Sequence, residues 1–237
     1  MQQAILDKWE AYNQLRVAGV KKQANQLLAE FISTLQQQDP KAISEFVNMV
    51  CMAVLETNHE IVANNGWRVS EMDTRIQHPL FKEIIVPELI QQYLQHSAMH
   101  IKWIGQLEQF FYADTATATH FLQAIQVEGF FSAFFFFEKS FALQPNQQTL
   151  SLLLSSLAQP LDYYMHEVPH AVLVHPDELT QALAVFKNYF QQVDNKAEWA
   201  QALQHWELIA THWSIYFSQK DGYENFEVYL QANGVVL

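Results

Sequence analysis

The sequence contains few of the residues that interrupt helices. Only 6 Gly and 7 Pro occur among 237 residues, and these two types disfavour helix interiors most strongly. Long stretches rich in Gln, Leu and Ala run between them without turn signals. We therefore predict an all-α protein, a multi-helix bundle or irregular helical array of about eight to ten helices with no sheet. Because no linker composition interrupts the chain, we expect residues 1–237 to form a single domain.

Positive charge is scarce as well. Lys and Arg together number 13 against 25 Asp and Glu, which gives a net charge of −12. Nucleic-acid binding depends on a basic surface that contacts phosphates, so we expect no nucleic-acid partner. An acidic surface favours solubility and suits a basic protein partner.

Cysteine and long apolar runs are also nearly absent. The single cysteine, Cys51, excludes a disulfide within the chain and fits a reducing compartment. We expect its side chain to be buried in the apolar run 47–55. The most apolar stretch, residues 129–137, is far shorter than the roughly 20 residues needed to span a bilayer. The first residues lack the apolar segment of a signal peptide. We therefore expect a soluble, cytoplasmic protein without a membrane partner.

Apolar periodicity and the positions of Pro and Gly predict where the helices lie. Asp39 followed by Pro40 is typical of a helix start, and we expect that helix to continue to about Asn64. The other expected helices cover residues 5–19, 20–38, about 80–112, 113–144, 176–193 and 196–220. Pro87 is able to kink the helix over 80–112. Residues 146–179 are expected to contain one or two shorter helices.

Residues 166–170 form the pattern His-Glu-x-x-His, which is the zinc-binding signature of helical metalloproteases. In that signature both histidines bind zinc from one helical face and the glutamate is the general base. Here Pro169 lies between the histidines, where its ring disrupts a helix. Val168, which precedes the proline, is expected to be extended. We therefore do not interpret this segment as a protease site.

Glu128 lies within the expected helix 113–144, and its carboxylate calls for a partner. Five of its neighbours at helical spacing are apolar, namely Phe121, Ala124, Ile125, Phe131 and Phe135. A buried carboxylate costs several kcal/mol unless it is neutralised, paired or bound to a metal. The chain has only 3 Arg, so a lysine, a histidine or a metal ion is the expected partner.

Two Glu-x-x-His patterns lie on either side of Glu128 in the sequence. They are Glu56 with His59, and Glu167 with His170. Spaced three residues apart on a helix, a carboxylate and an imidazole can bind one metal centre. This order of motifs resembles the ferritin-like di-iron carboxylate proteins, and haem-oxygenase-like di-iron oxidases share a similar arrangement. Val-Glu-Gly followed by aromatic residues, at 127–131, is similar to a ligand helix of the ribonucleotide reductase small subunit.

The resemblance covers about residues 40–172 and implies a metal centre in the helical core. Its ligands would be Glu56, His59, Glu128, Glu167 and His170, with iron, or else manganese, as the metal. The implied activity is that of an oxidase or oxygenase, an oxidoreductase whose catalytic residues and substrate are unknown. Such a site also requires a carboxylate from the first helix of the bundle. Glu30 is the best-placed candidate, but it lies off the apolar face of its helix.

A second class of function stays open beside the first. The chain is equally consistent with a non-catalytic acidic helical protein that binds another protein, as a scaffold, an inhibitor or an immunity-type protein. Convergence of Glu56, His59, Glu128 and His170 on one point would favour the di-iron site. A lysine or arginine partner for Glu128, or scattered positions of these side chains, would exclude it. His96 and His100, four residues apart, have no carboxylate at a useful spacing, and we interpret them as structural polar residues.

Overall fold

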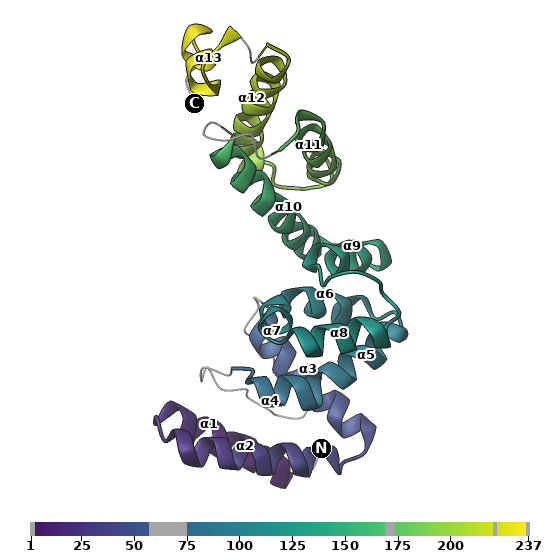
Figure 1. Ribbon diagram of the computed structural model, residues 1–237. Coiled ribbons are helices and arrows are strands. Elements are labelled where there is room, and N and C mark those ends of the chain that lie inside the picture. Colours follow the sequence, from purple (N-terminus) through teal and green to yellow (C-terminus); the bar gives the residue numbers. More distant parts are fainter. Residues whose placement is uncertain (1–2, 57–74, 169–173, 220–221, 236–237) are drawn as a thin grey trace. The chain divides into compact units, whose positions relative to one another are not determined.

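The computed structural model describes residues 3–56, 75–168, 174–219 and 222–235, and its regular structure is helical throughout these ranges (Figure 1). No strand occurs in them, which confirms the all-α prediction. They contain twelve helices, counting α4, η1 and α5 as one continuous helix, so the prediction of eight to ten was too low. The chain divides into two compact units, Met1–Phe136 and Phe137–Leu237. The division does not test whether the two units fold together, so the single domain expected for residues 1–237 stays a prediction.

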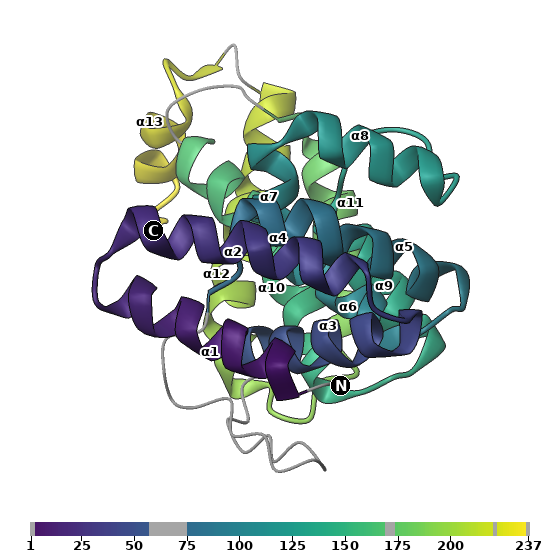
Figure 2. The same cartoon turned by 90° about the horizontal axis from the view of Figure 1, so that it is seen from below.

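The first unit begins with an antiparallel helical hairpin. Its two helices, α1 (Gln3–Val17) and α2 (Lys21–Gln36), lie side by side in both views (Figures 1 and 2). The turn between them uses Gly19 at φ 75°, a left-handed conformation that glycine adopts without strain. The helices that follow are α3 (Pro40–Leu55), α4 (His78–Leu80), η1 (Phe81–Ile85), α5 (Val86–Leu94), α6 (Ala98–Gln106), α7 (Glu108–Ala113) and α8 (Thr115–Ala124).

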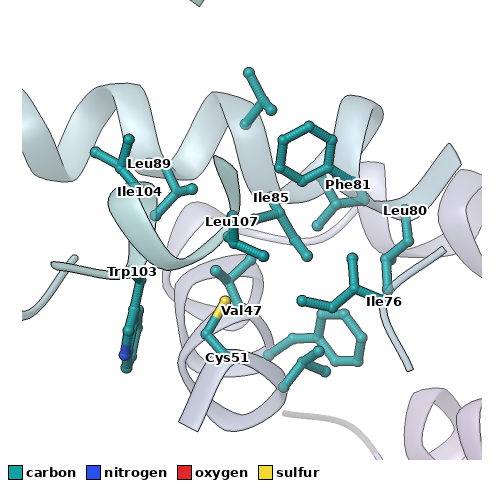
Figure 3. Packing of buried hydrophobic residues seen from close by; sticks show 14 of the residues in the cluster. Val47, Cys51, Ile76, Leu80, Phe81, Ile85, Leu89, Trp103, Ile104 and Leu107 are labelled. Carbon is teal, nitrogen blue, oxygen red and sulfur yellow. The ribbon is translucent and has the colours of Figure 1, made fainter. Parts of the chain in front are cut away.

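Asp39 caps the start of α3, as the sequence predicts. Its carboxylate accepts the backbone N–H of Ala42 at 2.9 Å, and Pro40 occupies the first helical position. The apolar face of α3 then packs into the core of the first unit, where Val47 and Cys51 lie fully buried (Figure 3). Complete burial of Cys51 confirms the expectation that it is a small core residue. Other core side chains in the same view are Leu80, Phe81, Ile85, Leu89, Trp103, Ile104 and Leu107.

The helix that begins at His78 contains one π-helical turn, η1, which ends two residues before Pro87. Proline has no N–H to donate, and its ring clashes with the carbonyl four residues earlier in a regular α-helix. The wider turn relieves this clash, since the N–H of Val86 reaches back five residues to the carbonyl of Phe81. The predicted kink at Pro87 is thus a local change of helix type, and the helix continues through it to Leu94.

The predicted helix over residues 80–112 is interrupted after Leu94, so its continuity was wrong. His96 adopts φ 59°, a left-handed conformation rare for a residue with a side chain. The N–H of Ser97 bonds the carbonyl of Gln92 at 3.0 Å, and that of His96 bonds the carbonyl of Tyr93 at 3.0 Å. This pair of bonds is the Schellman pattern that closes a helix end.

The second unit begins within α9 (Ala133–Leu143) and continues with α10 (Gln147–Glu167), α11 (Pro176–Phe190), α12 (Ala197–Gln219) and α13 (Phe226–Ala232). The prediction of one or two shorter helices over 146–179 was wrong, because α10 runs on through Pro160 as one helix of 21 residues. α11 packs against α10 and α12, with Phe186 and Trp206 edge to face at 5.0 Å. The indole N–H of Trp206 donates to Asp162 on α10 at 3.0 Å.

No helix in the described ranges combines the length and the apolar character that crossing a bilayer requires.

Candidate functional site

Glu56, the first predicted metal ligand, lies directly after the last turn of α3. The helix ends at Leu55, and Glu56 takes the extended angles φ −95° and ψ 135°. The prediction that this helix continues to about Asn64 was therefore wrong, and Glu56 does not present its carboxylate from a regular helical face. His59, its predicted neighbour at the metal, lies outside the described residues.

The carboxylate of Glu56 binds a lysine and a tryptophan of α6. Lys102 Nζ lies 2.7 Å from Glu56 Oε1 and donates to Oε2 at 2.9 Å. The indole N–H of Trp103 donates to Oε1 at 2.6 Å. The side chains of Lys102 and Glu56 are only 8% and 16% exposed, so the charges compensate each other where water is largely excluded. The cation that neutralises this largely buried carboxylate is thus a lysine.

His100 extends the same polar contact between α3 and α6. Its Nε2 lies 2.7 Å from Asn48 Oδ1, and its Nδ1 lies 2.7 Å from Ser97 Oγ. Burial lowers the pKa of His100 below its ordinary value, and the nearby negative charge of Glu88 partly offsets that effect. His100 is buried whereas His96 is exposed. Among the residues that the structure describes, neither belongs to a group of three or more side chains that could hold a metal ion.

We call this set of side chains the α3–α6 polar cluster. It consists of Asn48, Glu56, His100, Lys102, Trp103 and Gln106, whose amide N–H donates to the carbonyl of Leu55 at 2.9 Å. These hydrogen bonds connect α6 to α3 and to its C-terminal end, so the cluster fixes the position of α6 against α3. We interpret it as a structural element.

Glu128, the second predicted ligand, is not on a helix and is not buried. α8 ends at Ala124, and Glu128 lies exposed in the segment that connects α8 to α9. The prediction of a continuous helix over 113–144 with a buried Glu128 was wrong. Gln126, at φ 58°, closes α8, since the N–H of Val127 bonds the carbonyl of Leu122 at 2.9 Å. An exposed carboxylate is solvated by water and does not call for a metal.

Glu167, the third predicted ligand within the described residues, is the last residue of α10. Its Oε1 lies 3.1 Å from Nδ1 of the exposed His166. Val168 keeps the helical angles φ −52° and ψ −39°, so the expectation that it is extended was wrong. Pro169 and His170 lie outside the described residues.

The described residues do not assemble the predicted metal centre. Within them, no three or more His, Cys, Asp or Glu side chains gather in a group that could hold a metal ion. Glu56 binds Lys102, Glu128 is exposed and Glu167 contacts His166. Binding of iron or manganese involving His59 and His170 stays a prediction.

The segment that holds Glu128 instead presents an exposed aromatic side chain. We call residues 125–132, between α8 and α9, the Phe130 loop. Phe130 is 95% exposed, the largest exposed fraction among the exposed large apolar side chains of the described chain. The next residue, Phe131, is buried and stacks on Phe111 with ring centroids 4.3 Å apart. The loop is therefore held to the core by Phe131 while Phe130 points into solvent.

A second aromatic ring and two carboxylates lie near this loop. Tyr112, 52% exposed at the end of α7, makes an edge contact with Phe131 at 6.0 Å. Burial raises the pKa of Tyr112, and the negative charge of Glu108 adds to that rise. Glu108 is thus close to the Tyr112 ring, and Glu128 is exposed in the loop itself. The surface combines exposed aromatic rings, a side-chain type enriched at protein interfaces, with negative charge.

The sequence contains signals for Lys102 and Phe130, two residues that the sequence-based predictions did not include. Lys102 interrupts an apolar run, Ile101 to Ile104, which is where a buried cation would be sought. Phe130 follows Gly129, which adopts φ 99°, and a glycine inside an expected helix suggests a break. The pattern of consecutive phenylalanines concealed that break, because it fits a buried helix equally well.

Comparison with known proteins gives no match: no family model fits the chain, and no curated protein or solved structure matches it significantly.

Proposed function

We propose that this chain is a non-catalytic, acidic helical protein that binds a basic protein partner, and that the Phe130 loop is a contact site. The observation that carries the proposal is the 95% exposure of Phe130 in a loop whose neighbouring Phe131 is buried. An exposed phenylalanine contributes nothing to the core. Burying it in a partner would contribute about 1.5–3 kcal/mol to binding.

The backbone of the loop supports this proposal because it restricts where Phe130 can go. Gln126 and Gly129 both adopt positive φ, at 58° and 99°, and Phe131 stacks on Phe111. A loop backbone that is already held in place loses less conformational entropy on binding, and aromatic residues are frequent hot spots of interfaces.

Charge indicates the chemistry of the partner. Glu128 lies two residues from Phe130, and the whole chain carries a net charge of −12. A complementary surface would have an apolar pocket for the ring with Lys or Arg at its edge. Such complementarity mainly raises the association rate and makes binding weaken as salt is added.

Site-specific photo-crosslinking tests the proposal. A photoreactive phenylalanine analogue replaces Phe130, and as a control it replaces Leu94, which is 56% exposed on α5 of the same unit. We expect crosslinking from position 130, and not from 94, to one protein with a basic surface. Equal crosslinking from both positions would contradict the proposal. Crosslinking from position 130 only to a second copy of this acidic chain would contradict it as well.

The di-iron oxidase or oxygenase remains an untested prediction beside this proposal. The exposure of Glu128 removes the argument that its carboxylate needs a metal, and no described contact favours that function.

A further inference from the structure

A groove runs along α2 in the first unit, between that helix and the start of the helix formed by α4 and η1. Its volume is about 450 Å³, within the range of about 300–1,000 Å³ typical of ligand sites. Leu28 and Ile32, each only 3% exposed, form its apolar floor. Gln77 and Glu83 line the opposite side.

The residues of α2 that line the groove form two adjacent rows at four-residue spacing. The inner row is Leu28, Ile32 and Gln36, and the outer row is Asn25, Ala29 and Ser33. From Asn25 to Gln36 the helix rises about 16 Å at 1.5 Å per residue. That length matches about five residues of an extended chain at roughly 3.3 Å each. The small side chains of Ala29 and Ser33 leave the outer side of the groove open.

Three of the six polar residues that line the groove are carboxamides. Asn25, Gln36 and Gln77 each offer both a donor and an acceptor, which is the pairing that one peptide unit of an extended main chain requires. Gln36 Nε2 donates to Glu83 Oε2 at 3.3 Å, longer than the usual range of about 2.7–3.2 Å. Such a bond is readily exchanged for one to a bound chain.

The charge of the groove is negative. Glu83 is among its lining residues, and no Lys or Arg of the described chain is. From this lining we infer that the groove binds an extended, lysine- or arginine-containing segment of a partner protein, with its main chain bonded to Asn25, Gln36 and Gln77. This inference goes beyond the Phe130 contact and does not depend on it, because a peptide can enter the groove whether or not Phe130 is an interface residue.

Fluorescence anisotropy with a defined probe tests the inference on the full chain. The probe is a fluorescein-labelled octapeptide of alternating alanine and lysine with blocked ends. We expect saturable binding, and binding at least about tenfold weaker for the same peptide with N-methylated backbone amides. An alanine–glutamate octapeptide should not bind. These three measurements use the unsubstituted protein, so they do not depend on the folding of a variant.

Two substitutions locate the site. Ala29→Trp fills the groove from an exposed position and should weaken binding of the lysine peptide at least about tenfold, as should Ser33→Tyr. Ala116→Trp, at an exposed position of α8, is the matched control and should leave the affinity unchanged. A failure of the lysine peptide to bind up to about 1 mM would overturn the inference. Equal affinity for Ala29→Trp, or equal affinity for the N-methylated peptide, would overturn it too, because binding would then be purely ionic or located elsewhere.

Discussion

Lys102 on α6 and Glu56 at the end of α3 form a largely buried ion pair, with Nζ 2.7 Å from Oε1. Removing one partner of such a pair leaves an uncompensated charge and typically costs about 3–5 kcal/mol. We expect Lys102→Met to lower the free energy of unfolding by about 3 kcal/mol, as measured by urea denaturation. The double variant Glu56→Gln/Lys102→Met should recover part of that loss. Additive losses in this double-mutant cycle would show that the two side chains are not coupled.

His100 should make the stability depend on pH. Its pKa is lowered in the folded protein by burial, while in the unfolded chain it is about 6.5. The unfolded chain therefore takes up a proton first as the pH falls. Stability is complete above about pH 6.5 and declines below it, until the folded pKa is reached.

Urea denaturation at pH 7.5 and pH 5.5 checks this expectation for His100. The variant His100→Gln, which cannot titrate, should lose less stability between the two pH values than the unsubstituted protein does. An identical loss in both proteins would assign the pH dependence to other groups.

Gln126 closes α8 in a left-handed conformation at φ 58°. A side chain in this conformation costs about 1 kcal/mol, which glycine avoids. We expect Gln126→Gly to raise the free energy of unfolding by up to about 1 kcal/mol, and Gln126→Val to lower it. A glycine variant less stable than the valine variant in urea denaturation would argue against this conformation.

Phe130 and Phe131 are adjacent in sequence but opposite in environment, with exposed fractions of 95% and 8%. Phe131→Ala should cost about 3–5 kcal/mol, because it leaves a cavity beside Phe111. Phe130→Ala should change the free energy of unfolding by less than about 0.5 kcal/mol. Thermal or urea denaturation compares the two directly, and similar losses for both would mean that Phe130 is a core residue.

The sequence predicted the helical class and several helix ends for clear physical reasons. Asp39 followed by Pro40 marks a helix start by its own side-chain chemistry, and the structure confirms that cap. Pro145 likewise follows the end of α9 at Leu143. These signals are local, so neighbouring residues suffice to recognise them.

The candidate site was less predictable because one of its errors arises at a helix end without glycine. His96 and Gln126 both adopt the left-handed conformation that usually indicates glycine, and the sequence signal near the second of these ends was Gly129, three residues beyond it. One hidden end moved Glu128 from a buried helix to an exposed loop. The partner of Glu56 is 46 residues away at Lys102, a distance over which sequence pattern gives no information about contact.

The most direct test of the central claim uses the partner protein that crosslinks to position 130. Calorimetry with this purified partner and the purified chain, without crosslinking, measures the dissociation constant of the complex. We expect Phe130→Ala to weaken binding about 30-fold, which corresponds to a hot-spot contribution of about 2 kcal/mol. Glu128→Lys should also weaken binding, and the loss of affinity should be larger at low salt than at high salt. An unchanged dissociation constant for Phe130→Ala, with the stability of the variant intact, would contradict the account.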